Sequence, residues 1–157
     1  MKILSVDKIR DADAYTIKHE PISSLDLMER ASEKLFMWVC EHVDNKKSIE
    51  IFVGLGNNGG DGLALGRMLM NEGYEVSINV LRYSDNITDD FQINYDRLLD
   101  LDKHVVKNIS SLDEFNAVDE NTVIIDAIFG SGLSRPVIGF TGKIINEINK
   151  SGSVIIA

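Results

Sequence analysis

Cysteine, histidine and positive charge are scarce in this chain. Its 157 residues include one cysteine and three histidines, and 16 lysines and arginines stand against 25 aspartates and glutamates, for a formal net charge of −9. The single Cys40 excludes an internal disulfide, and its apolar neighbours predict a buried, unreactive thiol. The three histidines lack the spacing of a metal site. The negative charge, without a lysine or arginine cluster, argues against a nucleic-acid partner.

Long apolar segments are also missing. No run of about 18 apolar residues occurs, and the first residues do not begin a signal peptide. We therefore expect a cytoplasmic chain with no membrane partner. Hydrophobic residues make up 44% and charged residues 26%, which is ordinary for a globular protein. The length suits a single domain with a substantial core.

A glycine-rich stretch follows the apolar run 49–53 and precedes a helical pattern that predicts a helix over 63–72. Glycine allows a backbone to turn tightly or to approach a ligand. The start of a helix offers free N–H groups and the positive end of its dipole, which favour an anion, usually a phosphate. The spacing also matches the dinucleotide fingerprint. The stretch reads Phe52-Val53-Gly54-Leu55-Gly56-Asn57-Asn58-Gly59-Gly60-Asp61-Gly62.

Polar side chains make this stretch unusual. A plain phosphate cradle would not favour the acid Asp61, because like charges repel. Together with Asn57 and Asn58, it indicates a site for sugar hydroxyls, an amide or a cation as well. The alternative for Asp61 is a carboxylate that only compensates the dipole at a helix start.

The rest of the chain alternates between helical and strand patterns. We predict helices over 5–18, 23–42, 88–101 and 140–150, and strands over 49–53, 74–81, 104–109, 122–126 and 153–157, with a short helix or turn over 111–118. This order predicts a three-layer α/β/α, Rossmann-like fold with a mostly parallel sheet. Two extra N-terminal helices cover a face, an edge or a partner subunit. In the second of them, Leu35, Trp38 and Val39 are expected to point inward.

A second loop, 127–136, follows the strand that ends at Asp126. Ligands of such sheets bind beyond the carboxyl ends of the strands. Asp126 is therefore expected at the mouth of a cleft, where it either serves a ligand or caps the following turn. Arg135 either pairs with a phosphate or is a surface cation. The oxygen atoms of Asn58 and Asp126 suit an alkali or alkaline-earth cation.

The two loops together resemble the NAD(P)H-hydrate epimerase family, and Ser5-Val6-x-x-Ile9-Arg10 and Leu27-Met28-Glu29-Arg30-Ala31 fit it too. The resemblance implies an isomerase of nicotinamide cofactor repair, which interconverts the R and S epimers of hydrated NADH and NADPH at C6 of the ring. It also implies a homodimer and a potassium ion bound by Asn58 and Asp126. The implied substrate contacts are Asn57, Asn58, Gly59, Gly60, Asp61, Gly130, Ser131, Gly132, Leu133, Ser134, Arg135 and Pro136.

The sequence departs from the family at its end. In the family, the strand that begins here at Val154 leads into an Asp-x-Pro-Ser-Gly stretch, whose Asp is the leading acid/base and whose Ser is a further potassium ligand. This sequence stops at Ala157, before that stretch. The resemblance therefore implies that 1–157 is one epimerase-like domain that is incomplete at its C-terminus, with the catalytic residue beyond Ala157.

Two other functions stay open. An NAD(P)-dependent oxidoreductase would place an acid near the end of the second strand to hold the ribose. The residues there are Arg82 and Asp85, a poor match. A non-catalytic nucleotide- or protein-binding module is the other alternative, because a fold alone does not settle function. The presence of Asn58, Asp61 and Asp126 together argues against it.

Overall fold

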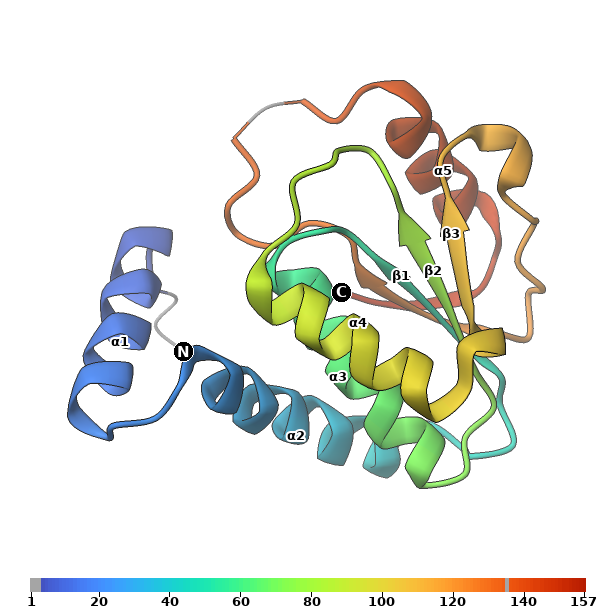
Figure 1. Ribbon diagram of the computed structural model, residues 1–157. Coiled ribbons are helices and arrows are strands. Elements are labelled where there is room, and N and C mark those ends of the chain that lie inside the picture. Colours follow the sequence, from blue (N-terminus) through green and yellow to red (C-terminus); the bar gives the residue numbers. More distant parts are fainter. Residues whose placement is uncertain (1–3, 135) are drawn as a thin grey trace.

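Five parallel strands form one sheet in the order β3-β2-β1-β4-β5 in the computed structural model, which describes residues 4–134 and 136–157. Two helices precede the first strand, and the others follow β1, β2 and β4 (Figure 1). The strands are β1 (Ile49–Val53), β2 (Val76–Leu81), β3 (Val106–Ile109), β4 (Val123–Ala127) and β5 (Val154–Ile156). The helices are α1 (Val6–His19), α2 (Ser24–His42), α3 (Asn57–Asn71), α4 (Asp89–Asp102) and α5 (Gly139–Lys150), with 3-10 turns η1 (Lys103–Val105) and η2 (Leu112–Glu114).

The predicted three-layer fold is confirmed, and every strand pairing is parallel. Alternate side chains of each strand point to opposite faces, so the sheet has two cores. One core lies under α2, α3 and α4 and contains Ile51, Ile78 and Ile125. The other lies under α5 and contains Phe52 and Ile124. With helices on both faces, the central strands β1 and β4 are mostly apolar, as parallel strands usually are.

Helix α3 begins at Asn57, six residues before the predicted start at 63. The glycines expected in a loop thus form the first turns of the helix. Their missing side chains let this helix lie directly on the sheet: a Cβ on Gly62 would be 2.6 Å from the Ala127 Cβ and 2.9 Å from Val53 Cγ1. A Cβ on Gly59 would overlap the Gly54 carbonyl oxygen. Glycine here therefore serves close helix–strand packing, which the helical pattern of apolar residues does not reveal.

The N-terminal helices pack less closely than predicted. The start of α2 is as expected, because Ser23 Oγ accepts a hydrogen bond from the Asp26 amide at 3.0 Å. The inward prediction is right for Val39 but wrong for Leu35 and Trp38, whose side chains are 49% and 45% exposed. The thiol of Cys40, predicted to be buried, is exposed as well. Leu35 and Trp38 line a small cavity with Ile125 and Ile156, so they are uncovered on the sheet side of α2, and the opposite side of the helix faces outward.

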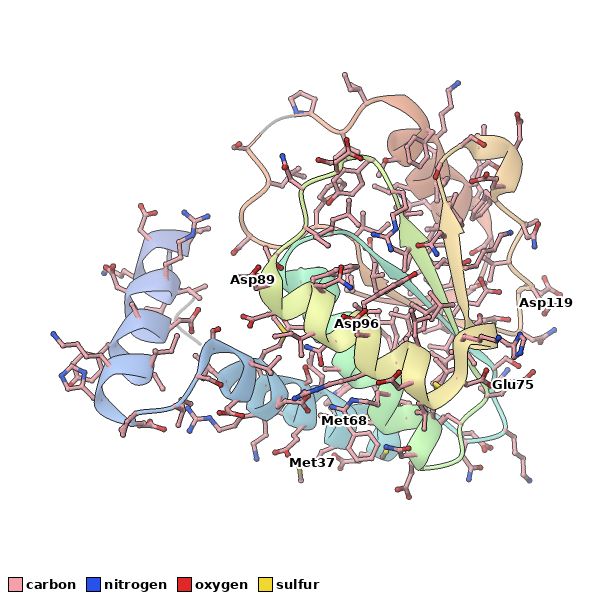
Figure 2. The ribbon with its side chains drawn as sticks, in the orientation of Figure 1. Met37, Met68, Glu75, Asp89, Asp96 and Asp119 are labelled. Carbon is pink, nitrogen blue, oxygen red and sulfur yellow. The ribbon has the colours of Figure 1, made fainter. Side chains whose placement is uncertain are left out.

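Figure 2 shows this outward face of α2, with Met37 pointing away from the sheet. Its side chain is 59% exposed. In α1 no residue is buried, so the apolar positions of this helix make no core (Figure 1). Among the described residues, no helix has the length and apolar character needed to cross a membrane.

Candidate functional site

A cavity of about 570 Å³ opens at the carboxyl ends of β1 and β4. Parallel sheets of this type bind their ligands at this edge. Both motif loops contribute to its walls, and so does α1. The lining residues are Ile9, Arg10, Asp13, Gly56, Asn57, Asn58, Asp61, Tyr83, Ile128, Phe129, Gly130, Ser131, Gly132, Leu133 and Ser134.

The sheet brings the two loops together. Strands β1 and β4 are neighbours, and the Gly54 amide donates a hydrogen bond to the Ala127 carbonyl oxygen at 3.1 Å just beyond the last paired residues. A Cβ on Gly54 would overlap the Ile128 carbonyl oxygen, so only glycine allows this approach. The second loop then passes beside α3, since a Cβ on Gly130 would be 3.2 Å from the Asn58 Cβ.

The first turn of α3 offers backbone donors to this cavity. Its N-cap is Gly56, which has no side chain to accept a hydrogen bond from the first amides. The first bond of the helix ladder runs from the Gly60 amide to the Gly56 carbonyl oxygen at 3.0 Å. The amides of residues 57–59 precede it and are the donors that a helix start leaves for a ligand. The anion site predicted from the sequence thus has its donors at the cavity wall.

Asp61 lies one turn further along α3 and also lines the cavity. Burial, followed by the negative charges of Asp13 and Asp90, raises the pKa of its carboxyl from 3.8 to about 6. These charges come from α1 and α4, so three helices set the protonation of this group. The carboxyl therefore gains and loses a proton close to neutral pH, which suits a general acid/base.

Asn58 and Asp126 share a smaller cavity of about 120 Å³ behind the first. Asp126 Oδ1 accepts a hydrogen bond from the Ile128 amide at 3.0 Å, so this oxygen caps the turn as one of the two interpretations predicted. The other carboxylate oxygen and the Asn58 amide oxygen are hard donors of the kind that potassium takes. Among the described residues, no cluster of three or more His, Cys, Asp or Glu side chains has the arrangement of a metal site. The donor set fits a weakly held alkali cation rather than a transition metal.

The structure brings most of the predicted substrate residues to one place. Asn57, Asn58 and Asp61 line the cavity together with residues 130–134. Gly59 and Gly60 are buried behind this wall. Pro136 is exposed and is not part of the lining, and Arg135 lies outside the described residues.

Sequence reasoning missed the contributions of α1 and of two aromatic residues. Arg10 lies beside the second loop, because a Cβ on Gly132 would be 3.4 Å from Arg10 Nη2. The match of Ser5–Arg10 to the family was the signal that pointed to this helix. Phe129 lies within the predicted second loop, 127–136, but was not singled out there. Tyr83 had no such signal, because it is a single aromatic residue in a loop.

Arg82 does not serve the ligand as the oxidoreductase alternative requires. Its Nε donates to Asn108 Oδ1 at 2.7 Å, and its guanidinium lies over the Tyr95 ring at 4.9 Å from the centroid. In the part of the chain that the structure describes, neither Arg82 nor Asp85 lines the cavity. The arrangement at the end of β2 therefore lacks the ribose contact of that class.

These features define a Rossmann-like α/β protein with a polar nucleotide-type site at the carboxyl edge of its sheet. The family described as YjeF-related protein N-terminus matches residues 24–157. The chain belongs to this family.

Relatives of known name agree with this membership. The NAD(P)H-hydrate epimerase of Lentilactobacillus buchneri is 36% identical over 153 residues, which are 97% of this chain and 68% of that protein. The enzyme of the same name from Oenococcus oeni is 34% identical, over 98% of this chain and 71% of its own length. The expectation of an isomerase of this family is confirmed.

Two further comparisons extend the picture. The bifunctional NAD(P)H-hydrate repair enzyme Nnr of Thermofilum pendens is 30% identical over the whole chain, which spans 30% of that larger protein. The crystal structure of yeast ynu0, YNL200c, superimposes with a TM-score of 0.77 at 26% identity and covers 99% of this chain and 68% of its own. The fold is thus shared with a protein of yeast.

Proposed function

We propose that this chain interconverts the R and S epimers of hydrated NADH and NADPH. The observation that carries the proposal is that both family loops line one cavity, with Asn58 and Asp61 at its wall. A nicotinamide dinucleotide brings two phosphates, two riboses and a hydrated ring with a carboxamide. The amides at the start of α3 suit a phosphate, and the polar side chains suit hydroxyls and an amide.

The phosphates have a second partner on α1. Arg10 lines the cavity beside the second loop, and its guanidinium provides the fork of donors that matches a phosphate. The loop 130–134 then lies over the same part of the ligand. In this proposal, Asn57, Asn58, Asp61 and residues 130–134 contact one bound molecule, which is supported by their common cavity.

Epimerisation at C6 requires a proton to be given and taken. When an acid protonates the C6 hydroxyl, water leaves; when water returns from the opposite face and gives up a proton, the other epimer forms. A carboxylic acid serves both steps, because it is regenerated at the end. We propose Asp61 for this role in the present chain, because it lines the cavity and has the raised pKa that suits such a group, although the resemblance implied an acid/base beyond Ala157. Asp126 lies in the adjoining smaller cavity.

We assign the cation to Asn58 and Asp126, and we propose potassium. A bound potassium ion supplies positive charge that holds negatively charged or polar ligand groups. We expect potassium chloride to raise the melting temperature of the parent chain more than choline chloride at equal ionic strength does. Asp126→Ala should abolish the difference. If the variant responds to potassium as the parent does, the assignment is wrong.

We also propose that the chain forms a homodimer. The apolar side chains Ile9 and Tyr15 on α1 and Met37 on α2 are exposed by 40%, 64% and 59%. A second copy would cover them. Sedimentation velocity at micromolar concentration should show a dimer, and a monomer would contradict this part.

The activity is tested by following pure S-form hydrated NADH by chromatography. We expect the chain to produce the R epimer until both forms reach equilibrium. Asn58→Ala should lose this activity, whereas Asp100→Asn, on a different surface of the molecule, should keep it. No interconversion, with the ligand still bound, would favour the binding-module alternative. Hydride transfer to an added oxidised substrate would favour the oxidoreductase.

A further inference from the structure

Tyr83 and Phe129 are the aromatic residues that line the cavity in the described part of the chain. Tyr83 lies just after β2, and Phe129 lies after β4. Strand β1 runs between these two strands, so the rings meet across its carboxyl end. Their centroids are 5.3 Å apart at an interplanar angle of 40°. This pair closes one side of the cavity above the Gly54-Leu55 turn.

The position of the Tyr83 ring is fixed from three sides. Its Oη accepts a hydrogen bond from the Leu55 amide at 3.2 Å. The ring rests against Phe129, which itself packs on the core under α5. Gly54 leaves room for the hydroxyl, because a Cβ there would be 2.9 Å from Tyr83 Oη. The ring is thus oriented by the fold before any ligand arrives.

Part of this oriented side chain stays available. Tyr83 is 38% exposed although its ring is held on three sides. Its hydroxyl accepts from Leu55 but donates to no acceptor within the residues that the structure describes. A phenol in this state offers an aromatic face and one O–H donor to a neighbouring molecule.

The two ring systems of the proposed substrate, adenine and hydrated nicotinamide, differ in how well they stack on an aromatic side chain. Adenine is planar and aromatic and stacks well on a side-chain ring. The hydrated nicotinamide ring is saturated at C6 and is not flat. Of the residues that line the cavity, the acid Asp61 and the amide Asn58 lie on α3, whereas the aromatic pair comes from the loops after β2 and β4. The cavity therefore has an aromatic side and an acidic side.

Given the proposed function, we propose that Tyr83, backed by Phe129, is the residue that binds the adenine half of the dinucleotide by stacking and by its O–H donor. The hydrated ring then lies toward Asp61 and Asn58. Tyr83 sets the preference for a dinucleotide over a mononucleotide and takes no part in the proton transfer at C6.

The test compares two ligands that do not react: ADP-ribose, which has the adenine, and ribose 5-phosphate, which lacks it. Calorimetry gives the dissociation constants for the parent, Tyr83→Ala, Tyr83→Phe and the control Ile93→Ala, which removes an exposed apolar side chain outside the lining. We expect Tyr83→Ala to weaken the binding of ADP-ribose about tenfold. It should leave ribose 5-phosphate unchanged. Tyr83→Phe keeps the ring and should lose only a small part of this affinity.

If Tyr83→Ala weakens the binding of both ligands equally, the ring only shapes the site. If it does not weaken the binding of ADP-ribose, adenine binds elsewhere. Either result overturns the inference. If Tyr83→Ala lowers the melting temperature, the measurement is repeated with Tyr83→Leu, which keeps apolar volume but has no aromatic face.

Kinetic measurements separate the inference from the proposed function. Tyr83→Ala should raise the KM for hydrated NADH, leave kcat unchanged, and leave the KM for hydrated nicotinamide mononucleotide unchanged. An inactive parent that still shows the ADP-ribose difference contradicts the proposed function alone.

Discussion

Helices α3 and α1 line the same cavity but are held in very different ways. Eight residues of α3 are buried, and its glycines bring the helix against β1 and β4. No residue of α1 is buried, yet Arg10 and Asp13 reach the cavity from it. The sheet side of the site is thus fixed by packing, while the α1 side depends on few contacts. Changes in α3 should therefore act on stability, and changes in α1 on binding.

The largest effect is expected where α3 touches the sheet. Gly62→Ala places a Cβ 2.6 Å from the Ala127 Cβ, and neither backbone can move away easily. Overpacking of this kind costs about 1–3 kcal/mol, partly offset by the better helix propensity of alanine. We expect a net loss of about 2 kcal/mol in the free energy of unfolding, measured with urea. Gly132→Ala is the control, because the nearest atom to a Cβ there would be Arg10 Nη2, at 3.4 Å. Equal stability of the two variants would refute the packing role.

The next largest loss of stability is expected at the contact of α2 with α3 and α4. Both Glu29 carboxylate oxygens accept hydrogen bonds from Arg67 at 2.6 Å, and Oε1 also accepts one from Arg97 at 2.7 Å. Glu29→Ala leaves the partly buried Arg67 unpaired and should cost about 1–3 kcal/mol.

The control for this pair is Glu20→Ala. Glu20 pairs with Arg30 at a site where both side chains are about half exposed. Such pairs contribute at most about 1 kcal/mol. Urea unfolding of both variants checks the difference, and equal losses would mean that the Glu29 cluster does not fasten α2.

A smaller effect with a distinct pH dependence is expected at Asp61. Its pKa is raised from 3.8 to about 6 in the folded protein, so the folded state holds a proton that the unfolded state has released. The stability of the parent should therefore fall as the pH rises from about 4 to 6. Asp61→Asn removes this dependence. The variant and the parent should be about equally stable near pH 4, and the advantage of the variant should grow as the pH rises to 7. A constant difference at all pH values would contradict the raised pKa.

The smallest effect on stability is expected in α1. Arg10→Ala removes a side chain that lines the cavity but supports no core. The melting temperature should stay unchanged, while the affinity for ADP-ribose falls by about 2 kcal/mol because a phosphate partner is lost. Lys8→Ala removes a cation of the same helix outside the lining and should change neither quantity. A loss of stability in Arg10→Ala would mean that α1 is packed more firmly than its exposure indicates.

The strand pattern and the two loops could be predicted because their signals are local. Apolar runs such as 122–126 indicate buried strands, and Asp126 was expected at the end of one of them. The start of α3 could not be read in the same way, because glycine at 59, 60 and 62 is typical of a loop unless the sheet behind it is known. The start of α3 is set by its packing against the sheet.

The residues that line the cavity could likewise be predicted only where they stand close together in the sequence. Asn57, Asn58 and Asp61 carried a polar pattern within one short stretch. Tyr83 and Phe129 come from distant segments and meet only because β1 lies between β2 and β4, while Arg10 reaches the cavity from α1. The exposed Leu35 and Trp38 had a helical period that predicts burial, but they line a small cavity on the sheet side of α2 and stay partly uncovered.

The most direct test of the account is a titration with hydrated NADH that is followed by the backbone amide resonances of the chain. If both loops build one site, the amides of 56–61 and 130–134 should shift together with a single dissociation constant. The amides around Glu29 and Arg97, which line a separate cavity of about 600 Å³, should not shift. Shifts around that second cavity, or in one loop without the other, would contradict the central claim.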